Sequence, residues 1–129
     1  MVVDTSALMA IVLGEPDAER YAAALSSAPR LLVAAPTWLE AAIVAQARLG
    51  PLGHALLTEL LDGLQVAIVP FDEGLARLAH DGWLRFGRGQ HPAGLNLGDC
   101  FAYALARQCG DPLIFKGEDF ARTDVLAAL

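Results

Sequence analysis

Short apolar runs alternate with longer helical patterns along the whole chain, and this alternation constrains the fold more than any other feature. The runs are rich in Val, Ile and Leu and have the length of buried strands. They lie at residues 1–4, 31–34, 65–69 and 112–115, and residues 125–127 form a weaker fifth candidate. Strands separated by helices pair in parallel through right-handed crossovers. We therefore expect an α/β fold with a four- to five-stranded, mainly parallel sheet flanked by helices.

The segments between the strands carry helix signals at their ends. We expect helices at residues 7–13, 16–26, 37–49, 52–61, 72–86 and 97–109. Gly14, Gly50 and Gly110 stand where three of them end, as glycine often does just beyond a helix. The third and fourth helices form a hairpin at Gly50-Pro51. A chain of 129 residues fits one domain, which we expect to span residues 1–129.

The composition excludes several classes of protein. No apolar run approaches the ~18 residues of a membrane span, and the N-terminus lacks the basic region of a signal peptide, so we expect a cytoplasmic protein. Cys100 and Cys109 form no CxxC pair, which predicts buried thiols without a disulfide or zinc site. The histidines have no metal-ligand spacing. A net charge of −6 argues against a generic nucleic-acid-binding surface, although carboxylates clustered around metal ions would be neutralised.

Four carboxylates stand at comparable points of the predicted fold. Asp4 closes the first strand, and Asp119 follows the fourth strand through a glycine-containing turn. Glu40 and Asp99 lie in the first turns of helices, directly after a strand and a loop. Ligands of open α/β sheets bind at the carboxyl edge, where all four would meet. The alternative for Asp4 and Asp99 is a helix cap, and for Glu40 a carboxylate satisfied by first-turn amides.

Four carboxylates at one edge would repel one another strongly unless a cation lay among them. Ligand sets made only of oxygen favour Mg²⁺ or Mn²⁺. One or two such ions activate water and stabilise the leaving oxygen when a phosphodiester is hydrolysed. We therefore expect Asp4, Glu40, Asp99 and Asp119, called the four acids below, to be metal ligands and catalytic residues.

The stretches around the four acids resemble the PIN domain, and more narrowly the VapC-type toxins of bacterial toxin–antitoxin pairs. The resembling stretches are Val3–Ala7, the helix that begins Leu97-Gly98-Asp99, and the turn Lys116–Phe120, and the likeness covers essentially the whole chain. This resemblance implies a Mg²⁺-dependent endoribonuclease that cleaves single-stranded RNA. It also implies a homodimer that a small VapB-type antitoxin holds inactive.

The resemblance also implies roles for the four acids. Asp4 and Asp99 would hold the main ion, while Glu40 and Asp119 would bind a second ion or orient water. The family more often has Asn or Asp where Glu118 stands. Whether Glu118 assists or merely flanks Asp119 is therefore open, as is the number of metal ions.

Other polar residues near the four acids have less specific expected roles. Thr5 or Ser6 would position a water or a phosphate, or else cap the first helix. Lys116 and Arg122 are close in sequence to the fourth acid and are candidates for phosphate contacts.

Two rival functions and one surface complete the predictions. A phosphatase of the haloacid dehalogenase type needs a second Asp two residues past the first, where this chain has Ser6. A non-catalytic PIN-like interaction module would be expected to lack one or more acids, and here all four are present.

The third and fourth predicted helices carry more apolar surface than one small sheet can cover. This surface consists of the leucines between Leu52 and Leu64 and the apolar helix Trp38–Val44, and it predicts a homodimer through these helices.

Overall fold

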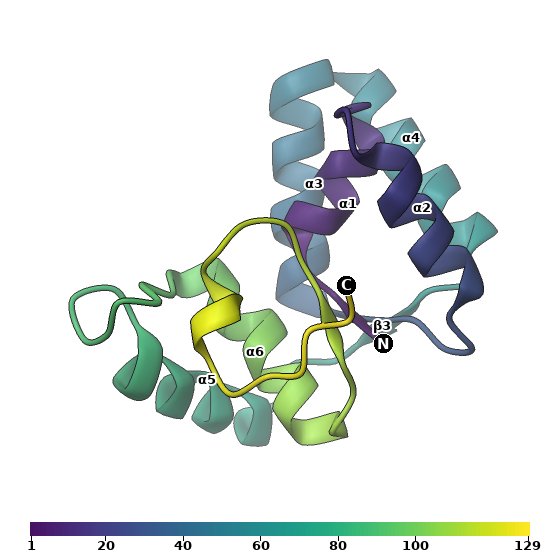
Figure 1. The fold of residues 1–129 in the computed structure, drawn as a ribbon. Helices are drawn as coiled ribbons and strands as arrows, with labels where there is room; N and C mark the ends of the chain where they lie inside the picture. Colours follow the sequence, from purple (N-terminus) through teal and green to yellow (C-terminus); the bar gives the residue numbers. More distant parts are fainter.

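A parallel four-stranded sheet separates two groups of helices in the computed structural model, which describes residues 1–129 (Figure 1). The strands are β1 (Val2–Val3), β2 (Leu32–Ala34), β3 (Ala67–Val69) and β4 (Leu113–Ile114). Their order is β3-β2-β1-β4, and every neighbouring pair is parallel. The predicted α/β class is therefore confirmed. The fifth strand is not formed as predicted, because residues 125–127 contribute only an isolated bridge between Leu113 and Ala127.

All six expected helices are present, with boundaries that differ by a few residues. They are α1 (Thr5–Val12), α2 (Ala18–Ser27), α3 (Ala35–Leu49), α4 (Pro51–Gly63), α5 (Glu73–Phe86) and α6 (Leu97–Cys109), and a 3₁₀ turn, η1, covers Phe120–Arg122. Two helices begin two residues earlier than expected. Asp4 caps α1, so this helix starts at Thr5. Pro36 lies in the first turn of α3, where its missing N–H costs nothing.

Alternate residues of each strand belong to the two faces of the sheet, as strand geometry requires. Val3, Val33 and Ile114 pack with α1, α2, α3 and α4 in one hydrophobic cluster. Val2, Leu32 and Leu113 pack with α5, α6 and Phe120 in the other. Figure 1 shows this division, with α1 to α4 on one side and α5 and α6 on the other.

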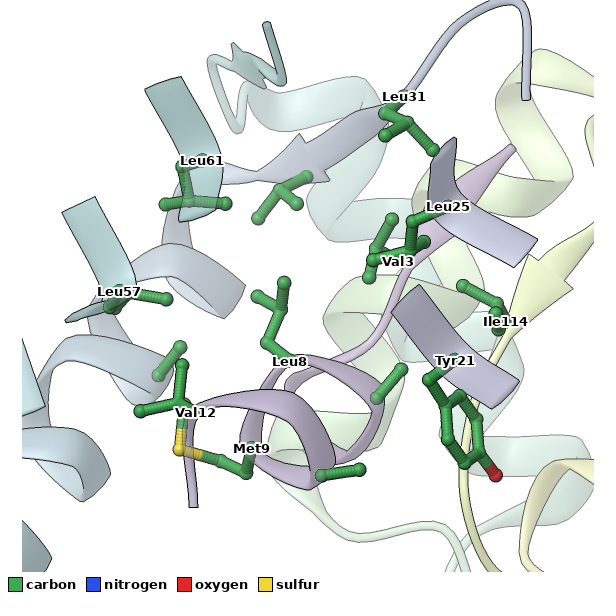
Figure 2. Close-up of a cluster of buried hydrophobic side chains, with 14 of the residues drawn as sticks. Val3, Leu8, Met9, Val12, Tyr21, Leu25, Leu31, Leu57, Leu61 and Ile114 are labelled. Carbon is green, nitrogen blue, oxygen red and sulfur yellow. The ribbon is translucent and has the colours of Figure 1, made fainter. Parts of the chain in front are cut away.

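Helix α1 is the centre of the first cluster, because nearly every one of its side chains is buried. Figure 2 shows Leu8 surrounded by side chains of β1, α2 and α4, among them Val3, Leu25 and Leu57. Burial of a large aliphatic side chain contributes about 1.5–3 kcal/mol. Since α1 follows β1 without a loop, this packing also holds the end of β1 in place.

Helices α3 and α4 form the predicted hairpin, which carries an exposed apolar surface. Leu39, Ile43 and Leu52 are 53%, 59% and 60% exposed. None of the helices combines the length and the apolar character that crossing a membrane requires. Cys100 is a buried free thiol, as expected, whereas the free thiol of Cys109 is only partly buried.

Candidate active site

Asp4 lies at the carboxyl end of the central strand β1 and is 4% exposed. Its Oδ2 accepts hydrogen bonds from the Ser6 amide at 3.0 Å and the Ser6 hydroxyl at 2.6 Å. Asp4 is thus the cap of α1, which was the alternative role for this residue. Burial raises the pKa of Asp4, the Ser6 bonds oppose that rise, and the nearby charge of Glu40 adds to it. The cap therefore places a costly buried carboxylate beside a second one.

Ser6 connects the ends of two neighbouring strands. Its hydroxyl donates to Asp4 and accepts a hydrogen bond from the backbone amide of Lys116, at 2.9 Å, just beyond β4. Both hydrogen bonds involve the Ser6 Oγ, so Ser6 orients the Asp4 carboxylate relative to the turn that carries Asp119.

Glu40 is held against the same region by Thr5. The Thr5 hydroxyl donates to Glu40 Oε1 at 2.6 Å. On its other side the Glu40 carboxylate lies against Gly98 of α6, where an added Cβ would overlap the carboxylate oxygens. Glu40 therefore occupies space that exists only because residue 98 has no side chain. It stands in the second turn of α3 and not in the first, because α3 begins at Ala35.

Asp99 combines a capping role with an unfavourable environment. Asn96 caps α6, and Asp99 Oδ2 accepts from the Asn96 amide at 3.0 Å, which completes a capping box. Burial raises the pKa of Asp99 to about 7, with further contributions from the charges of Asp4 and Asp119. Capping alone does not require such neighbours, since the capping bonds lower the pKa of a carboxyl.

Asp119 is exposed and stands at the start of η1, with no capping bond of its own. Its carboxyl lies within hydrogen-bonding reach of Asp99. Gly117, with φ of 106°, makes the turn from β4 that brings Asp119 there. The neighbouring Glu118 is also exposed, and its side chain makes no hydrogen bond or ion pair.

The structure thus brings the four acids to one edge of the sheet in a chain of close pairs. The charge of Glu40 contributes to the raised pKa of Asp4, and the charges of Asp4 and Asp119 contribute to the raised pKa of Asp99. No three of them are already arranged as a closed set of metal ligands. The four acids nevertheless fit a hard divalent cation, because all of their ligand atoms are carboxylate oxygens. No cationic side chain lies among these carboxylates to offset their mutual repulsion.

Neither Lys116 nor Arg122 forms an ion pair with any of the four acids. The Lys116 ammonium pairs with Glu15 and, at 2.9 Å, with Asp17. These contacts join the turn after β4 to the α1–α2 connection. Arg122 is exposed and takes part in no ion pair. The expected contacts of both with phosphate stay predictions, and Lys116 would first have to leave its two carboxylates.

Two residues of this region escaped the roles expected from sequence. Gly98 makes room for Glu40, and its signal is a glycine in a helical first turn, where glycine is otherwise unfavourable. The sequence predicts Thr37 only as the first residue of a helix, yet its fully buried hydroxyl has no hydrogen-bond partner. Its carbonyl lies 3.4 Å from the Thr5 hydroxyl, and it stands one turn before Glu40. No sequence signal distinguishes this threonine from an ordinary helix cap.

The amino-acid sequence matches the family model described as PIN domain over residues 1–126. It is 47% identical to a protein of Mycolicibacterium smegmatis named Ribonuclease VapC, over 98% of both chains. It is 45% identical to Ribonuclease VapC30 of Mycobacterium tuberculosis, over 97% of this chain and 95% of that one.

Solved structures share the fold at lower identity. VapC20 of Mycobacterium tuberculosis, described as a Sarcin-Ricin loop cleaving toxin, superposes with a TM-score of 0.78 at 17% identity, over 97% of this chain and 95% of that one. A toxin–antitoxin complex from Klebsiella pneumoniae gives a TM-score of 0.71 at 19% identity, over 99% of this chain and 97% of that one.

Proposed function

This chain belongs to the PIN-domain family and to its VapC ribonucleases, and we propose that its four acids bind the divalent metal ions of an endoribonuclease. The protein is a toxin ribonuclease of a toxin–antitoxin system that hydrolyses RNA phosphodiester bonds. The proposed cofactor is Mg²⁺ or Mn²⁺, the substrate is single-stranded RNA, and the reaction takes place in the cytoplasm. One functional unit spans residues 1–129.

The single observation that carries the metal site is the environment of Asp99. Its carboxyl is partly buried beside Asp4 and Asp119, and its pKa is raised to about 7. A structural capping residue gains nothing from two neighbouring carboxylates. A divalent cation reverses the sign of this environment, because each carboxylate then becomes a favourable ligand.

The residues of the chain divide the remaining work between them. Ser6 orients Asp4 through a 2.6 Å hydrogen bond, and Thr5 orients Glu40 through another of 2.6 Å. Asp4 and Asp99 would hold the main ion, while Glu40 and Asp119 would hold a second ion or orient the attacking water. When bound, the metal would supply Lewis-acid stabilisation of the charge that develops on the phosphate oxygens.

An antitoxin partner follows from the toxin function, and the surface beside Glu40 is suited to it. A groove of about 280 Å³ is lined by apolar residues of α3, among them Leu39 and Ile43, together with Phe101 of α6, and Glu40 stands at its border. An antitoxin segment with apolar side chains and one Arg or Lys would match this groove, since the cation would replace the charge of the metal. The exposed surface of α3 and α4 is the proposed contact of a homodimer.

Cleavage of an end-labelled pool of single-stranded RNA tests this function. We expect cleavage with Mg²⁺ or Mn²⁺ and none with EDTA. Asp4→Asn and Asp99→Asn should each lose most of the activity, whereas Asp62→Asn on the exposed surface of α4 should retain it. A folded wild-type protein that binds its antitoxin but cleaves no RNA under any metal condition would instead indicate the non-catalytic interaction module.

A further inference from the structure

Asp124, near the C-terminus, accepts contacts from three side chains of two helices. The Tyr103 hydroxyl donates to Asp124 Oδ1 at 2.9 Å. Arg85 of α5 and Arg107 of α6 pair with Asp124 Oδ2 at 3.1 and 3.4 Å. We call these four residues the Asp124 clasp. The clasp fastens the segment after η1 to both helices.

The hydroxyl in the clasp has a fixed position. Tyr103 is fully buried, and its ring lies directly against Gly82 of α5, where any Cβ would overlap it. Its ring also contacts Phe86, with centroids 5.9 Å apart. Burial and Asp124 raise the pKa of Tyr103 to about 12, so the hydroxyl stays protonated and donates its hydrogen bond. Asp124 is therefore held at a point that packing of α5 on α6 defines.

The clasp lies on the same side of α6 as Asp99 and Asp119. Asp99 and Tyr103 are four residues apart in this helix, so their side chains lie on one face, one turn apart. Asp119 and Asp124 stand at the two ends of one short segment that contacts this face. One end of the segment places Asp119 beside Asp99, and the other end is fixed to α5 and α6 by the contacts of Asp124.

Apart from the clasp, the segment is held by the buried ring of Phe120 and by local hydrogen bonds of η1, none of which involves the Asp119 side chain. Phe120 is buried and its ring contacts Phe115, with centroids 5.2 Å apart. Asp119 itself is exposed and has no capping bond. Without the clasp, the segment after η1 would lose its side-chain contacts with α5 and α6, and Asp119 would be free to move away from Asp99 about Phe120.

We propose that Tyr103, Asp124, Arg85 and Arg107 are positioning residues that hold Asp119 beside Asp99 and so preorganise the metal site. This inference rests on the proposed function, since it assumes that Asp119 is a metal ligand. Holding ligands together before the ion arrives lowers the cost of binding it. Loss of the clasp should therefore weaken metal binding more than it slows cleavage at saturating metal.

The chain contains a matched control at the opposite end of the sheet. Asp111 also bridges two cations, the N-terminal ammonium at 3.0 Å and Arg30 at 2.9 Å. It lies just before β4, at the opposite edge of the sheet from the four acids. Asp111→Asn and Asp124→Asn thus remove equivalent charges from equivalent bridges, and only the second touches the segment of Asp119.

Direct titration with Mn²⁺, followed by electron paramagnetic resonance in the absence of RNA, tests the proposal. We expect Asp124→Asn to raise the Kd of Mn²⁺ about tenfold, the lower end of what supporting residues of metal sites contribute. The rate of RNA cleavage at saturating Mn²⁺ should stay within about twofold of wild type. Asp111→Asn should lower the melting temperature by a similar amount and leave the Kd unchanged.

A second variant guards against misfolding. Tyr103→Phe keeps the buried ring and removes only the hydroxyl, and it should raise the Kd by a smaller factor. The proposal is overturned if Asp124→Asn and Tyr103→Phe melt lower but bind Mn²⁺ as wild type does, or if Asp111→Asn weakens binding equally. A wild-type protein that binds no Mn²⁺ would overturn the metal site and the clasp together. Normal wild-type binding with unaffected variants would overturn the clasp alone.

Discussion

Replacing Asp99 by Asn should stabilise the metal-free protein while abolishing its activity. Because the pKa of Asp99 is raised to about 7 from an ordinary 3.8, folding favours its neutral form. The stability that this group contributes is fully present below about pH 4 and is lost as the pH rises through 7. At pH 8 the wild-type chain therefore carries the full cost of burying an ionised carboxylate beside Asp4 and Asp119, whereas the neutral Asn avoids it.

The size of the effect follows from the pKa shift after correction for solvent. A shift of about 3 units corresponds to roughly 4 kcal/mol at 1.36 kcal/mol per unit. Asp99 is partly exposed, so screening reduces this to about 1–2 kcal/mol. The Asn oxygen can still accept from the Asn96 amide, so the capping box largely survives. For a chain of this length, we expect a rise of roughly 3–8 °C in melting temperature.

Thermal unfolding by circular dichroism in EDTA measures this difference. The gap between the two proteins should be largest at pH 8 and should narrow toward pH 4, because Asp99 of the folded wild type is protonated well below pH 7. Added Mg²⁺ should raise the melting temperature of wild type and affect Asp99→Asn much less.

The control for this measurement is Asp72→Asn. Asp72 caps α5 by accepting from the Leu75 amide at 3.0 Å and contacts none of the four acids. Asn caps nearly as well, so the melting temperature should change little at any pH. If Asp99→Asn unfolds at a lower temperature than wild type at pH 8 in EDTA, Asp99 is a structural cap and the clustered metal site is wrong.

Three further predictions concern individual contacts. Gly98→Ala should displace the Glu40 carboxylate and reduce RNA cleavage at least about tenfold, while circular dichroism shows a folded protein. Thr37→Val should raise the free energy of unfolding by about 1 kcal/mol in urea titration, because Val has a similar shape and lacks the unpaired buried hydroxyl. A loss of stability would reveal a partner for that hydroxyl. Light scattering should detect a dimer that Leu52→Glu disrupts, and a wild-type monomer at micromolar concentration would contradict the proposed interface.

Much of the fold was determined by local signals that the sequence carries openly. Apolar runs followed by capped helices predicted four parallel strands and six helices, because strand length, caps and glycine stops act over a few residues. The same junctions placed Asp4, Asp99 and Asp119 at one edge. Their neighbouring residues also carried the resemblance to PIN-domain toxins, since the chemistry of the site restricts those positions directly.

Only the tertiary structure decided which side chains meet across the sheet. The Lys116 ammonium turned out to pair with Glu15 and Asp17, about a hundred residues away in sequence. Asp124 and Tyr103 showed no sequence signal at all, and the expected fifth strand was reduced to one bridge. Such contacts depend on how helices pack and rotate against the sheet, and that packing is the sum of many distant contacts that no local pattern records.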